Sequence, residues 1–121
     1  MVIEESRNLG YLAKLTYIIT SNPVRPGPEL EEIWRVLPQH IDYWEALAAE
    51  GKVFGGGPIW RTESPRDRWW GVGSIVVEAN SEDEAKQMAE KDPMHLEGVR
   101  SFTVAPWLVN HVAAAHRKIL A

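Results

Sequence analysis

His40 and Asp92 are the two side chains whose types and positions best suit proton transfer. Apolar residues follow His40 at spacings of four, seven and eight, which places the imidazole on the core-facing side of a helix. Asp92 follows Ala85 by seven residues and lies at the end of a second helical segment, on its buried face. A carboxylate bonded to an imidazole fixes the ring tautomer and stabilises the imidazolium that forms when the ring takes a proton. The pair can therefore act as an oriented general base if the fold brings the two residues together.

Nucleophilic groups are poorly represented in the chain. It contains no cysteine, which excludes thiolate nucleophiles, disulfides and cysteine-ligated metals. The serines Ser21, Ser74 and Ser101 have no surrounding pattern that marks a nucleophile. Nucleophilic catalysis is therefore weakly supported.

Metal and cofactor sites are also weakly supported. His111 and His116 are five residues apart and fall on different faces of a helix, and His95 has no companion ligand at a useful spacing. We expect His95 in a turn, with a place in the pocket lining as the lesser alternative. The glycine run 55–57 lacks the lysine and the serine or threonine that follow it in a phosphate-binding loop. We predict neither a metal ion nor a cofactor.

Turn-forming residues divide the first half of the chain into a strand, a helix and a β-hairpin. Proline is favoured in the first turn of a helix, so we place the start of the main helix near Pro38 and His40 in its first turn. In that position the helix N-terminus disfavours the imidazolium form of His40, while the Asp92 carboxylate favours it. The sequence therefore leaves open the direction in which the pKa of His40 shifts. The three glycines permit a bulge or a close approach of another backbone. The expected elements are strand 12–20, loop 21–28, a helical turn at 30–36, a helix from Pro38 to about Glu50, strand 52–60, charged loop 61–68 and strand 69–79.

The second half repeats the order of helix and strand. Ser81 and Glu84 form a capping box, which makes this helix start the best-specified boundary in the chain. Pro106 favours an edge position for the last strand. The expected elements are a helix from Ser81 to about Lys91, a turn at 94–98, strand 100–108 and an amphipathic helix over 109–121.

The order βαββαβ predicts an α+β, ferredoxin-like fold with a four-stranded antiparallel sheet and both helices on one face, plus an extra C-terminal helix. The two helices run antiparallel, so the start of the first and the end of the second lie at the same end of the domain. His40 and Asp92 therefore come together there, beside loop 21–29, the hairpin tip 60–69 and the turn 94–99. The sheet's second face is left uncovered, which predicts a homodimer or a higher even homo-oligomer.

Bulk composition limits the class of protein. The length of 121 residues predicts one domain, with a core over about 11–108 and a tail over 109–121. A net charge of −4 with scattered lysines and arginines argues against a nucleic-acid partner. No apolar run approaches the ~20 residues that span a bilayer, and we expect a cytoplasmic protein without a membrane partner. The six tryptophans are unusual for this length, and those at 60, 69 and 70 flank a polar turn that suits a pocket or a dimer surface.

Five motifs, taken in order, resemble the YCII-related family, which belongs to the dimeric α+β barrels. The resemblance implies a dimer whose sheets face each other, and it matches His40 and Asp92 to the family's catalytic His/Asp pair. Relatives include dehydrochlorinases of chloroaromatic breakdown, and the wider superfamily includes muconolactone isomerases. The chain departs from the usual pattern in its N-terminal extension, its 21–28 loop, its hairpin and its tail. The motifs are His40-Ile41-Asp42-Tyr43-Trp44, residues 51–58 (GKVFGGGP), residues 78–85 (EANSEDEA), Asp92-Pro93-Met94 and residues 104–107 (VAPW).

Two hypotheses of function follow. The first is a cofactor-independent lyase or isomerase in which His40 is the base and Asp92 orients it, acting on a small cyclic or aromatic-derived molecule. The second is a non-catalytic dimer that binds a small ligand in the same pocket. A purely structural His40–Asp92 pair that ties two helix ends together is the remaining alternative. The candidate substrate-binding residues are Arg25, Trp44, Gly57, Trp60, Arg61 and Trp70, with Arg25 and Arg61 as holders of an anionic group.

Overall fold

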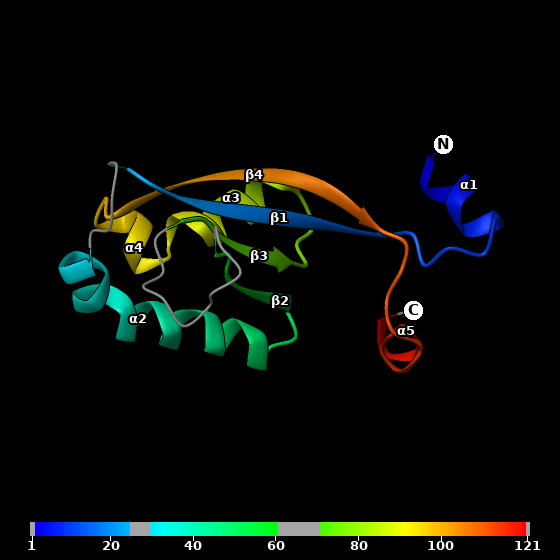
Figure 1. The fold of residues 1–121 in the computed structure, drawn as a ribbon. Coiled ribbons are helices and arrows are strands. Elements are labelled where there is room, and N and C mark those ends of the chain that lie inside the picture. The colour runs from blue at the N-terminus through cyan, green and yellow to red at the C-terminus, as the bar shows by residue number, and fades with distance from the viewer. Residues whose placement is uncertain (1, 25–29, 61–70, 121) are drawn as a thin grey trace.

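A four-stranded antiparallel sheet forms the centre of the molecule (Figure 1). The computed structural model describes residues 2–24, 30–60 and 71–120. The strands follow the order β2-β3-β1-β4, which places β4 at an edge as its proline predicts. The βαββαβ order and the ferredoxin-like topology are confirmed. The strands are β1 (Lys14–Pro23), β2 (Val53–Pro58), β3 (Gly73–Val77) and β4 (Arg100–Val109).

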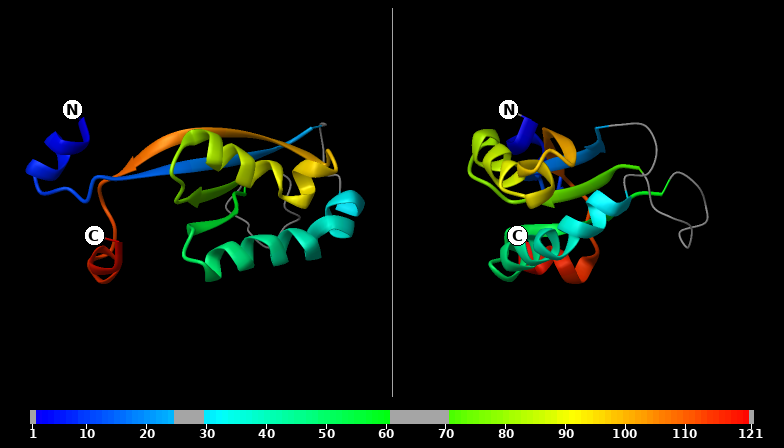
Figure 2. Two further views of the ribbon diagram at one scale, coloured as in Figure 1. Left: turned by 180° about the vertical axis from the view of Figure 1, so that it is seen from behind. Right: turned by 90° about the vertical axis from the view of Figure 1, so that its left-hand side faces the viewer.

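Two helices, α2 (Leu30–Ala49) and α3 (Glu82–Glu90), pack on one face of this sheet (Figure 2). Alternate residues of β1 turn toward them, because successive side chains of a strand point to opposite faces. The Ser81 side chain accepts a hydrogen bond from the Glu84 backbone N–H at 3.1 Å, as the capping box predicts. The main core consists of Tyr17, Ile19, Trp44, Val77, Ala85, Met88 and Ala89.

The helix α2 is continuous over 20 residues, so the expected break before Pro38 is wrong. Pro38 is exposed at the helix surface, and water can satisfy a carbonyl group that loses its helical N–H partner there. His40 consequently lies in the middle of α2, and the expected influence of a helix N-terminus on its ring does not apply. The additional N-terminal turns cover the short helix α4 (Pro93–Leu96) and form a second apolar cluster with it, made of Ile33, Val36, Met94 and Val99.

The strand β1 extends through residues 21–23, which we expected to form a turn. Ser21 pairs with Phe102 and Pro23 pairs with Arg100, so the partner strand β4 holds the triplet in the sheet. Pro23 is accommodated because it is the last residue of the strand, where a missing N–H matters least. This extension places Ser21 on the same face as Tyr17 and Ile19, toward the helices.

Helices at the two ends of the chain lie beyond the sheet. The helix α1 (Val2–Asn8), which the sequence analysis did not predict, has no buried residue. The helix α5 (Ala114–Leu120) begins later than expected, because residues up to Val109 belong to β4. Arg117 donates a hydrogen bond of 2.7 Å to the Gly10 carbonyl oxygen. Figures 1 and 2 show α1 and α5 at the end of the sheet where β1 begins and β4 ends, away from the other helices. Within the described ranges, no helix is both long and apolar enough to cross a lipid bilayer.

The glycine run 55–57 forms both features that the sequence predicts, a β-bulge and a close approach to another strand. The register of β2 against β3 shifts between Val53 and Gly55, which is a bulge. A Cβ atom on Gly56 would lie 2.8 Å from Ile75 Cγ1 and 2.9 Å from the Ser74 carbonyl oxygen. Only a residue without a side chain fits this position.

We expect Gly56→Ala to lower the free energy of unfolding by about 1–3 kcal/mol, because the added methyl group forces apart two packed strands. Gly55→Ala is the matched control, since a Cβ at Gly55 meets no atom within 4 Å. Urea denaturation of both variants measures the difference. Equal midpoints for the two would show that the approach at Gly56 is not tight.

Candidate active site

His40 and Asp92 are in direct contact, from the middle of α2 and from the residue that precedes α4. The His40 Nδ1 atom lies 2.9 Å from Asp92 Oδ1 and 2.8 Å from Asp92 Oδ2. Asp92 is the N-cap of α4, where its Oδ1 accepts the Met94 backbone N–H at 2.9 Å. The Trp44 Nε1–H, one helical turn after His40, donates to Oδ2 at 2.8 Å. The carboxylate thus accepts hydrogen bonds from three donors that belong to two helices.

This environment keeps Asp92 ionised although it is 1% exposed. Burial alone would raise the pKa of the carboxyl group, but hydrogen bonds from His40, Trp44 and a backbone N–H, with the charge of His40, hold the pKa below its usual value. An ionised carboxylate only accepts hydrogen bonds. The His40 Nδ1 atom must therefore carry a proton, and in the neutral ring the lone pair is on Nε2.

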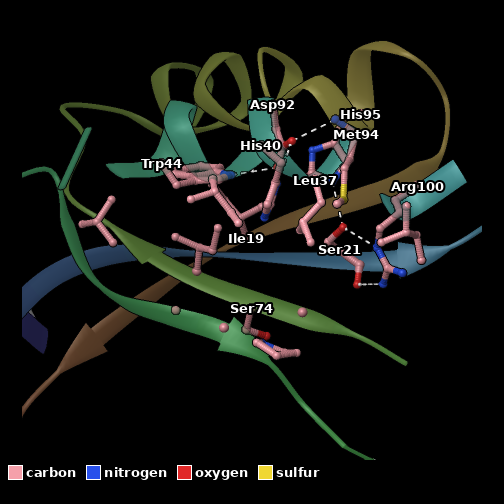
Figure 3. Close-up of a pocket in the computed structure, with 18 of the residues that line it drawn as sticks. Ile19, Ser21, Leu37, His40, Trp44, Ser74, Asp92, Met94, His95 and Arg100 are labelled. Atoms are coloured by element: carbon pink, nitrogen blue, oxygen red, sulfur yellow. Dashed lines mark hydrogen bonds and ion pairs between the residues drawn. The ribbon is translucent and has the colours of Figure 1, made fainter. Parts of the chain in front are cut away.

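The His40 side chain is 25% exposed and lines a large cavity between α2 and the sheet (Figure 3). The cavity has a volume of about 930 Å³. Its walls are mainly apolar, with a few polar groups at its floor, as is common in small-molecule sites. The described lining includes Ile19, Ile33, Trp34, Leu37, Ile41, Val53, Pro58, Ile75 and Met94.

Three of the candidate substrate-binding residues also line this cavity. Trp44 is buried at its floor, while Gly57 and Trp60 lie on the side of β2. The other three candidates, Arg25, Arg61 and Trp70, lie outside the described residues. Among the residues that are described, no three His, Cys, Asp or Glu side chains gather closely enough to hold a metal ion.

Tyr43 helps to hold the helix that carries His40 and Trp44. Its hydroxyl donates a 2.7 Å hydrogen bond to the Met88 carbonyl oxygen, and its ring packs edge-on against Trp44 at 5.0 Å. Burial and the negative charge of Asp92 raise the pKa of Tyr43 to about 12. Tyr43 thus stays protonated and holds α2 against α3.

A second polar group at the cavity corrects the expectation for Ser21 and decides between the two alternatives for His95. The Ser21 Oγ atom is 2.8 Å from His95 Nε2, and the buried Arg100 donates from Nε to Ser21 Oγ at 3.0 Å. Ser21 therefore has a distinctive context, and His95 lines the cavity rather than merely forming a turn. The alternation of Tyr17, Ile19 and Ser21 is the signal that could have placed this serine on the inner face.

His95 predicts a component of acid sensitivity. Burial lowers its pKa, outweighing the opposing effect of its hydrogen bond to the Ala89 carbonyl oxygen. Because the unfolded chain takes up this proton near pH 6.5 and the folded chain only at lower pH, the contribution of His95 to stability is lost as pH falls below about 6.5. We expect His95→Gln to lose less stability than the unmodified protein between pH 7 and pH 5 in urea titrations. Parallel curves for the two proteins would contradict this.

Comparison with known proteins assigns the family. The family profile of YCII-related domains matches residues 16–108. The chain belongs to the YCII-related family. Comparison with curated proteins gave no match.

Among solved structures, this YCII-related chain is similar to 5-chloro-2-hydroxyhydroquinone dehydrochlorinase (TftG) from Burkholderia phenoliruptrix AC1100, in complex with 2,5-dihydroxybenzoquinone. The two are 28% identical, with a TM-score of 0.63, over 78% of this chain and 93% of the dehydrochlorinase. A dimeric protein of unknown function from Bacteroides fragilis NCTC 9343 is 17% identical, with a TM-score of 0.45, over 78% and 95% of the two chains.

Proposed function

We propose that this YCII-related protein is a lyase or isomerase that transfers a proton through His40 and needs no cofactor for that step. The observation that carries the proposal is the double contact of His40 Nδ1 with a buried, ionised Asp92. This contact leaves the basic nitrogen, Nε2, on the cavity side of the ring. The pair thus has the base, the orienting group and the enclosed space that general-base catalysis requires.

The proposed step moves one proton. His40 Nε2 takes a proton from a carbon or hydroxyl of the substrate, and Asp92 stabilises the imidazolium. The electron pair that is released forms a new double bond. In an elimination a halide ion leaves with its bonding pair and the imidazolium then releases the proton to water, and in an isomerisation the imidazolium returns the proton to another carbon.

The substrate class follows from the cavity and from the dehydrochlorinase. Apolar walls with Trp44 and Trp60 suit the faces of a small ring, and Gly57 leaves room for the ring edge. The dehydrochlorinase structure holds a dihydroxylated six-membered ring. We therefore propose a small hydroxylated, aromatic-derived substrate, with Arg25, Arg61 and Trp70 as further candidate contacts.

We also propose that the protein is a homodimer that pairs the outer faces of two sheets. Val76, Ile18 and Ala105 form an apolar row across β3, β1 and β4 on the face away from α2 and α3. Trp107 lies on the same face, two residues along β4 from Ala105, and is 47% exposed. Sedimentation equilibrium should give the mass of two chains.

The assay follows chloride release from 5-chloro-2-hydroxyhydroquinone, with a muconolactone as the isomerase substrate. We expect turnover by the unmodified protein and its loss in His40→Ala. His116→Ala, which removes an exposed histidine of α5, is the matched control and should remain active. Binding of these compounds without any turnover would favour the non-catalytic ligand-binding dimer, and full activity of His40→Ala would overturn the role of His40.

A further inference from the structure

Ser21, His95 and Arg100 form a hydrogen-bonded group at the cavity, next to the His40–Asp92 pair but separate from it (Figure 3). Ser21 comes from β1, Arg100 from β4 and His95 from α4. Arg100 is 4% exposed, and its Nη2 atom also donates to the carbonyl oxygens of Ser21 and Gly71. The proton-transfer step proposed above does not use any of the three.

The position of each proton in this group follows from its partners. His95 Nδ1 lies 2.7 Å from the Ala89 carbonyl oxygen, which only accepts, so Nδ1 carries the ring proton. In the neutral ring Nε2 is then an acceptor, and the Ser21 hydroxyl donates to it. Arg100 Nε is a permanent donor, so Ser21 Oγ accepts from it.

Ser21 is thereby fixed as a hydrogen-bond acceptor toward the cavity. A hydroxyl group has one proton and two lone pairs. The proton is used by His95 and one lone pair by Arg100, which leaves one lone pair on a residue that lines the cavity. Turning the Ser21 proton toward a ligand would leave the half-buried His95 Nε2 without its donor, which is unfavourable.

We propose that Ser21 is a specificity-determining residue that selects substrates carrying a hydroxyl group, with His95 as the positioning residue that holds it in the acceptor orientation. The inference rests on the proposed function for the presence of a small ring in this cavity. A substrate O–H donates to Ser21 Oγ, while a methoxy or carbonyl group at the same place puts a second acceptor against it. Failure to form a buried hydrogen bond of this kind gives strong discrimination between otherwise similar ligands.

The same geometry predicts that the preference depends on pH. Once His95 is protonated, both ring nitrogens donate, and Ser21 accepts from His95 and from Arg100. The Ser21 proton then turns toward the cavity, and the site prefers an acceptor. The charged and titratable groups around the His95 ring are Asp92 at the start of α4, His40 on α2 and Arg100 on β4.

The test measures the affinity of chlorohydroquinone and of its dimethyl ether by calorimetry under nitrogen. The unmodified protein should prefer the hydroquinone at least tenfold at pH 7, and Ser21→Ala should reduce that ratio to about one. Ser21→Thr keeps the hydroxyl group and should retain the preference. Ser74→Ala removes another serine that lines the cavity and is the matched control. Urea titration of each variant verifies folding.

The pH dependence of the ligand preference shows whether His95 orients the Ser21 hydroxyl or only packs against it. As the pH falls below about 6.5 and folded His95 takes up its proton, the preference of the unmodified protein should decline, whereas His95→Gln, which keeps an acceptor for Ser21 but does not titrate, should hold a constant ratio. Equal affinity for the two compounds, no binding of chlorohydroquinone, or an unchanged preference in Ser21→Ala would overturn the proposal. His40→Ala should retain the binding preference, so a failure of the proposed catalysis is distinguishable from a failure at Ser21.

Discussion

Asp92→Asn should lower turnover by about 10²–10⁴-fold, the range that general acid–base catalysis contributes. Among the described residues, the groups that hydrogen-bond to the Asp92 carboxylate are all donors: His40 Nδ1 contacts both oxygens, Met94 N contacts Oδ1 and Trp44 Nε1 contacts Oδ2. An asparagine brings one NH₂ group into this set. The ring of His40 either loses the negative charge that stabilises its imidazolium or turns to the tautomer with a proton on Nε2, which is no longer a base.

The same substitution should lower the free energy of unfolding by about 1–3 kcal/mol, because in either orientation the asparagine NH₂ faces an N–H group. In one orientation the NH₂ group faces the Trp44 Nε1–H, and in the other it faces the Met94 backbone N–H. Trp44→Phe removes the first of these conflicts. In a double-mutant cycle, Asp92→Asn should therefore cost less stability when it is combined with Trp44→Phe, by roughly 1 kcal/mol.

Activity and stability separate in this cycle. The double variant recovers part of its stability but not its turnover, since the carboxylate charge is still missing. Chloride release and urea midpoints on the four proteins measure both effects. An Asp92→Asn protein that is destabilised yet fully active would show that the pair is structural.

Arg100→Met should destabilise the protein by about 2–4 kcal/mol. The side chain is buried and donates to two backbone carbonyl oxygens, those of Ser21 and Gly71, as well as to Ser21 Oγ. Methionine fills a similar space but leaves these acceptors without their donor, at roughly 1–3 kcal/mol for each buried group that water cannot reach. The connection between β1, β4 and the residues before β3 is lost.

Arg35→Met is the matched control for this prediction. Arg35 also forms an ion pair, with Glu97 at 3.2 Å, but both side chains are exposed. Pairs of this kind contribute about 0–1 kcal/mol. If the urea midpoints of the two variants agree, the buried contacts of Arg100 do not stabilise the fold.

Much of the fold was predictable because its local patterns agree with each other. The capping box at Ser81 marks the start of α3, and the alternation of residues in β1 identifies its core face. The antiparallel order of the helices predicts that His40 meets Asp92, and the two are in contact, although His40 lies in the middle of α2 and not at its start. The meeting of the two residues follows from the topology, while the exact position of His40 along α2 depends on the added N-terminal turns.

The remainder depends on tertiary contacts that no local pattern contains. Pro38 normally marks a helix start, yet α2 continues through it because its N-terminal turns gain the apolar contacts of Ile33 and Val36 with α4. Ser21 begins a turn-forming triplet, yet pairing with β4 keeps it in a strand. The group formed by Ser21, His95 and Arg100 joins three elements distant in sequence, so its members carry no common motif.

The position of Asp92 as a helix cap has a consequence for protein engineering. One carboxylate caps α4 through Met94 and accepts hydrogen bonds from Trp44 and His40, so a change that tunes the proposed base also weakens the start of the helix. Libraries aimed at new substrates should therefore keep this residue and its donors fixed. Variation belongs on the cavity wall at Leu37, Ile41 and Ile75, where a side chain can change size without removing the partner of a buried polar atom.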